Sequence, residues 1–181
     1  GLLFSSLNGF FLNLKTPRRS FDFTSIADAV FSYYVRVEGK VAIYGASNVD
    51  LSCFIKVLKE RYPDLNIIDH ASGYGFEPDE HCFPELDFIL VGMGGLLQDK
   101  VAIRLSALNP NAQIMTCGAF ISQTAGSGGD YYPYIVNKLN LRFLYRFWRE
   151  PRILKRVAHK YPYFILSYLL DCSSRFFSGM R

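Results

Sequence analysis

The chain has 181 residues, of which 50% are hydrophobic and 20% are charged. This composition excludes a largely disordered protein, since disorder needs low hydrophobicity and high net charge. The net charge of +4 hides a division: residues 1–137 carry 10 basic and 14 acidic side chains, whereas residues 138–181 carry 10 basic and 2 acidic ones. An acidic body with a basic tail is typical of a protein with an anionic partner.

The first 137 residues alternate predicted strands and helices. In chain order these are helix 26–37, strand 40–44, helix 49–61, strand 65–69, strand 86–91, helix 96–108 and strand 112–117. Strand 86–91 is almost entirely apolar, which is typical of a central strand that is buried on both faces. The alternation predicts an α/β domain, namely a Rossmann-like parallel sheet with helices on both faces.

Two polar motifs predict helix starts. Ser25 and Asp28 have the spacing of a capping box with Asp in place of Glu, and Asn48 occupies the expected N-cap position of helix 49–61. In parallel sheets, ligands bind beyond the carboxyl ends of the strands. The candidate binding loops are therefore 45–48, 70–75, 92–99 and 118–129.

Glycines follow the most apolar strand. Gly92-Met93-Gly94-Gly95 joins this strand to helix 96–108, and such glycines let a phosphate approach the backbone N–H groups of a helix N-terminus. An ordinary tight turn explains the same spacing. Gln98 and Asp99 follow in the first turn of the helix, where they either contact a base or sugar or simply suit the helix dipole.

The sequence predicts no bound metal and no other cofactor. The four cysteines and three histidines lack the spacing of metal ligands, and no Asp-x-Asp motif occurs. Glu77-Pro78-Asp79-Glu80 is explained better by an acidic helix start.

Beyond residue 133 the pattern is helical, over 133–148, 151–160 and 162–172. Residues 138–181 are predicted to form a helical appendage, separate from the body at 1–137. Its basic residues recur every three or four positions and are interleaved with aromatic ones, which favours an anionic membrane surface. Nucleic acid is not favoured, because no nucleic-acid-binding signature occurs.

The ordered motifs resemble those of a known family. They are RYPDLNII (61–68), GYGF (73–76), DFILVGMGGLLQDK (87–100), CGAF (117–120) and LRFLYRFWREPRILKR (141–156). This series resembles the WecG/TagA/CpsF glycosyltransferases, glycosyltransferase family 26. The resemblance implies transfer of a sugar, commonly of the N-acetylmannosamine type, from a UDP-sugar to a polyprenyl-diphosphate-linked acceptor. It also implies peripheral attachment to the inner face of the bacterial cytoplasmic membrane, in cell-surface or exopolysaccharide synthesis.

The resemblance also assigns residues. Gly92, Gly94, Gln98 and Asp99 fall on the family's donor-site motif, and the family's usual acid is Glu where this chain has Asp. Gly45, which follows the predicted strand 40–44, is added to this donor site. Arg146, Arg152 and Arg156 fall on arginines that are implied to face diphosphate. The tail residues left for the membrane are Arg142, Trp148, Arg149, Lys155 and Lys160.

Some positions depart from the family pattern. Phe120-Ile121 replaces a Phe-Asp pair, and a glycine-rich stretch at 126–133 replaces a basic one. Gly1 matches the glycine of an Asp-Gly pair whose Asp is the implied catalytic base. The base is therefore expected upstream of Gly1, and this chain by itself is expected to have little transferase activity.

Two classes of function remain open on the sequence. The first is an inverting glycosyltransferase, or the larger part of one, whose arginines rather than a metal stabilise the leaving diphosphate. The second is a non-catalytic α/β module that docks on anionic membrane through its basic tail. Binding of a nucleotide diphosphate in the body discriminates between them, and in either case an oligomer is compatible with the sequence.

Overall fold

The computed structural model describes residues 20–127, 136, 141, 145 and 162–170. The chain divides into two compact units, Gly1–Tyr131 and Tyr132–Arg181. Each unit is described by itself.

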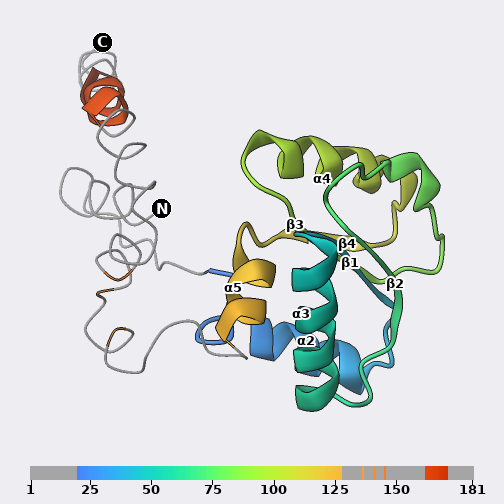
Figure 1. Ribbon diagram of the computed structural model, residues 1–181. Coiled ribbons are helices and arrows are strands. Elements are labelled where there is room, and N and C mark those ends of the chain that lie inside the picture. The colour runs from blue at the N-terminus through green and yellow to red at the C-terminus, as the bar shows by residue number, and fades with distance from the viewer. Residues whose placement is uncertain (1–19, 128–135, 137–140, 142–144, 146–161, 171–181) are drawn as a thin grey trace, which may run out of the picture. The chain divides into compact units, whose positions relative to one another are not determined.

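The first unit contains a sheet of four parallel strands in the order β2-β1-β3-β4 (Figure 1). The strands are β1 (Val41–Gly45), β2 (Ile67–Ala71), β3 (Phe88–Gly92) and β4 (Gln113–Thr116). The predicted α/β class is confirmed, and β3 lies between β1 and β4 as its apolar sequence predicts. β2 begins two residues later than predicted.

Helices cover both faces of the sheet, as predicted (Figure 1). One face carries α2 (Ala27–Arg36), α3 (Asn48–Arg61) and α5 (Phe120–Ser127), and the other carries α4 (Leu96–Leu108). The prediction of a loop over 118–129 is wrong for residues Phe120–Ser127, which form α5. Phe120, Ile121 and Thr124 are buried, so that packing on α3 stabilises a short helix whose polar and glycine-containing sequence gives little local signal.

The face under α2, α3 and α5 is densely aromatic. Phe21 lies edge-on to both Phe31 and Phe120, and Phe54 meets Phe120 with ring centroids 5.4 Å apart. Tyr34 stacks on Phe88 of β3 with centroids 4.8 Å apart. These contacts join all three helices to the sheet.

The predicted capping residues of α2 and α3 are both wrong. Ser47 rather than Asn48 caps α3, accepting a hydrogen bond from the Asp50 N–H at 3.1 Å. The N-cap of α2 is Ile26, without a side-chain hydrogen bond. In place of a capping box, Asp28 accepts from the Tyr62 hydroxyl and forms an ion pair with Arg61.

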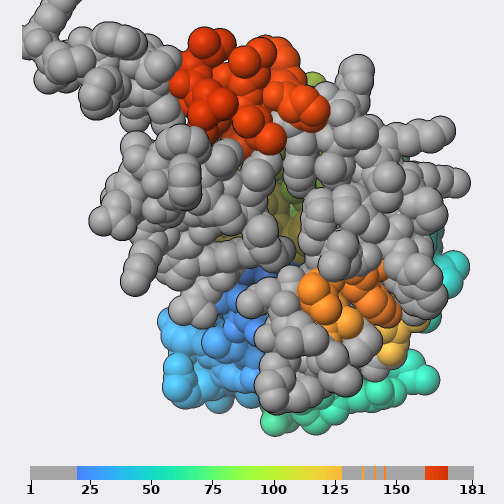
Figure 2. Space-filling model, turned by 90° about the vertical axis from the view of Figure 1, so that its left-hand side faces the viewer, coloured from blue at the N-terminus to red at the C-terminus, as the bar shows by residue number. Residues whose placement is uncertain are grey.

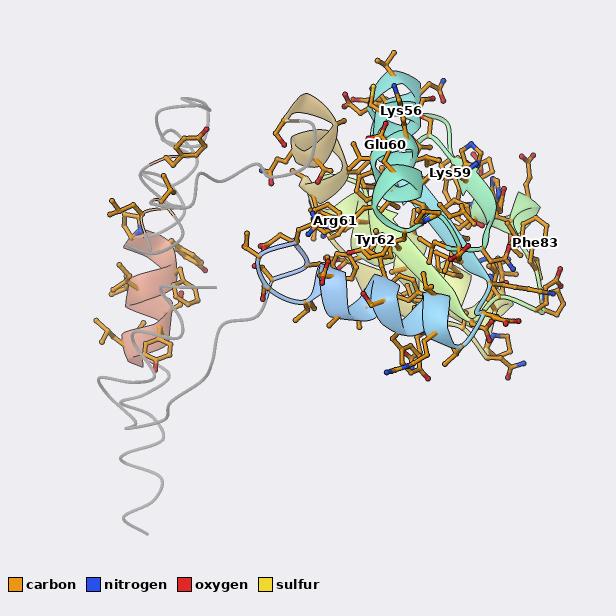
Figure 3. The ribbon with its side chains drawn as sticks, turned by 90° about the horizontal axis from the view of Figure 1, so that it is seen from below. Lys56, Lys59, Glu60, Arg61, Tyr62 and Phe83 are labelled. Atoms are coloured by element: carbon orange, nitrogen blue, oxygen red, sulfur yellow. The ribbon has the colours of Figure 1, made fainter. Side chains whose placement is uncertain are left out.

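Arg61 and Tyr62 therefore fasten the end of α3 to α2 (Figure 3). The Arg61 guanidinium also lies 4.4 Å from the ring centroid of Phe23, a cation–π contact. Burial and the Asp28 hydrogen bond raise the pKa of Tyr62. No sequence pattern predicts these contacts, because the partners Phe23 and Asp28 lie far from Arg61 and Tyr62 in the chain.

A polar cluster lies on the opposite face. The fully buried Tyr44 donates its hydroxyl to Asp69 Oδ2 at 2.7 Å, and His81 Nδ1 lies 2.7 Å from the same oxygen. Phe76 stacks on His81 and touches Tyr44. This cluster holds the connection between β2 and β3 against the sheet, so that His81 has a structural role here.

The connection between β2 and β3 contains the short 3₁₀ helix η1 (Pro78–Glu80). Asp79 pairs with Arg104 of α4, and the Asn109 amide donates to the His81 carbonyl. Pro and acidic residues thus start a helical turn at 77–80, as predicted. Within the described ranges, no group of three His, Cys, Asp or Glu side chains has the geometry of a metal site.

Of the second unit, residues 162–170 form a helical segment, red in Figure 2. Tyr163, Leu166 and Leu170 are each more than half exposed. No helix in the described part of the chain has the length and apolar character required to cross a bilayer.

Candidate functional site

The sheet has its topological switch point between β1 and β3. The chain leaves β1 through α3 toward β2 and leaves β3 through α4 toward β4, and these two helices lie on opposite faces. At such a point the loops beyond the two strands diverge, which creates the crevice where open α/β sheets bind ligands. The candidate site therefore lies beyond Gly45 and Gly92.

Gly45 and Gly92 bring the two strand ends together. Gly45 has φ of +140°, and a Cβ on it would lie 2.3 Å from the Gly92 carbonyl oxygen. The Ala46 N–H donates to that same oxygen at 3.1 Å. These two predicted donor-site glycines thus build the floor of the crevice through backbone packing.

The loop after β2 joins this floor. Gly73 N–H and Ser72 Oγ both donate to the Ala46 carbonyl, at 3.0 and 3.1 Å. A Cβ on Gly73 would lie 3.1 Å from Met93 Cγ and 3.2 Å from Gly45 Cα. Tyr74, the next residue, is 80% exposed at this junction. Loop 70–75 is one of the predicted binding loops, but no sequence pattern predicts its attachment to the other two loops.

Gly94 and Gly95 stand at the N-terminus of α4. Both are exposed, and a Cβ on either would meet nothing within 4 Å. Gly95 is the N-cap with φ of +59°, and no side chain caps the helix there. Among the residues that the structure describes, no side chain accepts a hydrogen bond from the first N–H groups of α4. The helix dipole makes this end favourable for an anion.

Gln98 and Asp99 lie in the first turn of α4 but differ in their contacts. Gln98 is partly exposed, and its Oε1 accepts from the Gly118 N–H at 3.2 Å. Asp99 is exposed. The fold therefore brings all five predicted donor-site residues, namely Gly45, Gly92, Gly94, Gln98 and Asp99, to one edge of the sheet. Gly118, the first residue of the predicted loop 118–129, joins them through its contact with Gln98.

Two side chains fill the space beneath Gly92. A Cβ on Gly92 would lie 2.5 Å from Ile121 Cδ1 and 3.0 Å from Cys117 Sγ. Burial raises the pKa of the Cys117 thiol to about 12, so this cysteine is a neutral packing group. Ile121, which departs from the family pattern, is fully buried here.

The predicted tail residues lie outside the described residues. These are Arg146, Arg152 and Arg156, assigned to diphosphate, and Arg142, Trp148, Arg149, Lys155 and Lys160, assigned to the membrane. Gly1 also lies outside them.

Comparison with known proteins identifies the family. The profile described as "Glycosyl transferase WecG/TagA/CpsF family" matches residues 9–176. The chain belongs to the WecG/TagA/CpsF family. The resemblance found in the sequence motifs is thereby confirmed, and the chain is a member of a glycosyltransferase family.

Two curated relatives add detail. The chain is 29% identical, over 98% of its length and 77% of the relative's, to the UDP-Gal:alpha-D-GlcNAc-diphosphoundecaprenol beta-1,4-galactosyltransferase of Shigella boydii. It is 30% identical, over 59% of its length and 43% of the relative's, to the N-acetylglucosaminyldiphosphoundecaprenol N-acetyl-beta-D-mannosaminyltransferase of Staphylococcus aureus strain NCTC 8325. Both family members are named as transferring a sugar to a lipid-diphosphate-linked acceptor.

Proposed function

We propose that the protein binds a UDP-sugar in the crevice between the β1 and β3 ends and transfers the sugar, with inversion, to a polyprenyl-diphosphate-linked acceptor. The observation that carries this proposal is the meeting of three glycine-containing loops at the switch point of a family glycosyltransferase fold. The two relatives, named for galactosyl and N-acetylmannosaminyl transfer, support a hexose or N-acetylhexosamine as the transferred group.

The chemistry of the crevice suits a nucleotide diphosphate. The uncapped N–H groups at Gly95 favour phosphate oxygens, and the exposed Asp99 carboxylate is an acceptor for ribose or sugar hydroxyls. We propose that Gly94 leaves room for this approach, because its Cα faces open space.

Calorimetric titration with UDP tests the site. Gln98→Ala and Asp99→Asn should each weaken UDP binding by about 1–2 kcal/mol, typical of losing one hydrogen bond in a polar site. Asp50→Asn is the matched control, because Asp50 occupies the first turn of α3 instead of α4. Unchanged UDP affinity in both α4 variants, or no UDP binding by the parent chain, contradicts the proposal.

We also propose that donor binding needs no metal ion. Arg146, Arg152 and Arg156 would then balance the charge of the leaving diphosphate, since arginine matches phosphate geometry with two parallel hydrogen bonds. UDP affinity should be the same in EDTA and in manganese. Loss of binding in EDTA, restored by manganese, refutes this point and directs attention to Glu77 and Asp79.

We propose that residues 138–181 attach the protein to the inner surface of the cytoplasmic membrane. Their 10 basic and 2 acidic side chains support this, as do the exposed apolar residues of helix 162–170. Each Lys or Arg near an anionic leaflet contributes about 1 kcal/mol. The full chain should float with anionic vesicles and be released at high salt, whereas a chain ending at Asn137 should not float. Equal flotation of both chains excludes the tail as the anchor.

A further inference from the structure

The side-chain amide of Gln98 has its orientation set by the protein backbone. Its partner is the N–H of Gly118, at 3.2 Å. A backbone N–H only donates, so the atom of Gln98 that faces it must be the oxygen. The Nε2 amino group, with its two donor hydrogens, is therefore on the other side of the amide.

The Gly118 N–H is itself held in place. The preceding residue extends the pairing of β4 with β3, since the Cys117 N–H donates to the Val91 carbonyl at 2.9 Å. The chain then turns at Gly118 with φ of +59°, and the Phe120 N–H donates back to the Cys117 carbonyl at 3.2 Å. The donor that orients Gln98 thus belongs to the sheet and to the start of α5.

We infer that Gln98 contacts the bound nucleotide-sugar through the donor hydrogens of its Nε2 group, and that Gly118 is the positioning residue that orients the amide in this way. The inference rests on the proposed function. Gln98 Nε2 then contacts an acceptor oxygen of the ligand, either a phosphate oxygen or a uracil carbonyl. The neighbouring Asp99 carboxylate only accepts hydrogen bonds. Gln98 then binds an acceptor oxygen of the ligand, and Asp99 binds a hydroxyl donor of the same ligand.

An isosteric variant isolates the donor. Gln98→Glu retains an oxygen for the Gly118 N–H but has no donor while it is ionised. Its UDP affinity should fall about 10-fold to 100-fold, the range for a lost hydrogen bond to a charged group. Part of the loss should be recovered as the pH falls and the introduced carboxyl gains a proton, whereas Gln98→Ala should show no such recovery. An affinity equal to that of the parent chain overturns the inference.

The positioning role is tested by a double-mutant cycle. Gly118→Ala places a side chain at positive φ and displaces the N–H, so UDP affinity should fall in the parent background. In the Gln98→Ala background the same change should have no further effect, because Gly118 acts through Gln98. Additive losses would assign Gly118 a merely structural role and would overturn that part of the inference.

A measurement without nucleotide keeps the test independent of the proposed function. In hydrogen exchange, the Gly118 amide should lose protection in Gln98→Ala but retain it in Gln98→Glu. Equal protection in the parent chain and Gln98→Ala overturns the geometry. If the exchange result holds but the parent chain binds no UDP, the proposed function fails while the orientation of Gln98 stands as a structural contact.

Competition with uridine then identifies the oxygen. A Gln98→Glu loss found with UDP but not with uridine assigns the contact to phosphate, and an equal loss with both assigns it to the uracil carbonyl. No loss with either ligand overturns the inference.

Discussion

The two faces of the sheet are covered in different ways. In the described part of the chain, α2, α3, α5 and a dense set of phenylalanine rings cover one face, whereas α4 and the connection between β2 and β3 cover the other. On the second face the connection is held by Tyr44, Asp69 and His81. One face is therefore stabilised mainly by apolar packing, and we expect the other, which carries the candidate site residues of α4, to depend more on specific hydrogen bonds.

The largest expected difference concerns two fully buried leucines, Leu58 on α3 and Leu105 on α4. Leu58→Ala should lower the free energy of unfolding by about 3–5 kcal/mol and Leu105→Ala by about 2–3 kcal/mol. The reason is that a single helix shifts to fill a cavity more easily than three helices locked by aromatic rings. Urea denaturation of both variants measures this. Equal losses would show that the two faces pack alike.

The second prediction concerns alkaline pH. Because burial raises the pKa of Cys117 to about 12 from an ordinary value of 9.0, the folded state binds more protons between these values than the unfolded state. The stabilisation is complete below pH 9, and the free energy of unfolding then falls by up to about 1.4 kcal/mol per pH unit as pH rises.

Cys117→Ala should reduce this slope between pH 9 and 11, measured by urea denaturation at each pH. Cys53→Ala, which removes an exposed cysteine, is the control. The slope is compared rather than the absolute stability, since the alanine also leaves a small cavity. An unchanged slope in Cys117→Ala would mean that the thiol is not enclosed between the strand end and α5.

The third prediction compares two tyrosine hydroxyls on opposite faces. Tyr44 donates to the Asp69 carboxylate at 2.7 Å, and Tyr34 donates to the neutral Gln113 amide at 3.0 Å. Tyr44→Phe should cost about 1.5–3 kcal/mol and Tyr34→Phe about 0.5–1.5 kcal/mol, because hydrogen bonds to charged groups are stronger. The reverse order in thermal unfolding would contradict the view that the α4 face depends more on polar contacts.

The smallest effect is expected at two non-glycine residues with positive φ, Glu38 after α2 and Ala46 at the crevice floor. Glu38→Gly should stabilise the protein by about 0.5 kcal/mol, since relief of the left-handed conformation exceeds the added entropy of the unfolded chain. Ala46→Gly should be close to neutral, because it also removes a methyl group that packs on the core. In differential scanning calorimetry, Glu38→Gly should raise the melting temperature and Ala46→Gly should leave it almost unchanged. A lower melting temperature for Glu38→Gly would contradict the prediction.

The sequence by itself determined the α/β class, the central position of β3 and the family. Residues 86–91 form a nearly continuous apolar run. Such a run indicates a strand buried on both faces, and it is recognised from contiguous residues alone. The turn at Gly92–Gly94 and the start of α4 are also predictable from the sequence, because glycines between a strand and a helix permit a tight backbone turn. The motifs that identify the family are contiguous in the chain.

Contacts between distant parts of the chain depend on the three-dimensional structure. Asp28 accepts from Tyr62, 34 residues away, in place of a local capping contact. The short helix α5 exists because its apolar side chains are buried against α3 and the end of β3. The orientation of Gln98 depends on a backbone N–H 20 residues farther along the chain. In a parallel sheet the carboxyl ends of the strands meet at one edge, which brings the loops of distant segments within hydrogen-bond distance. No local sequence pattern encodes which of these loops become neighbours.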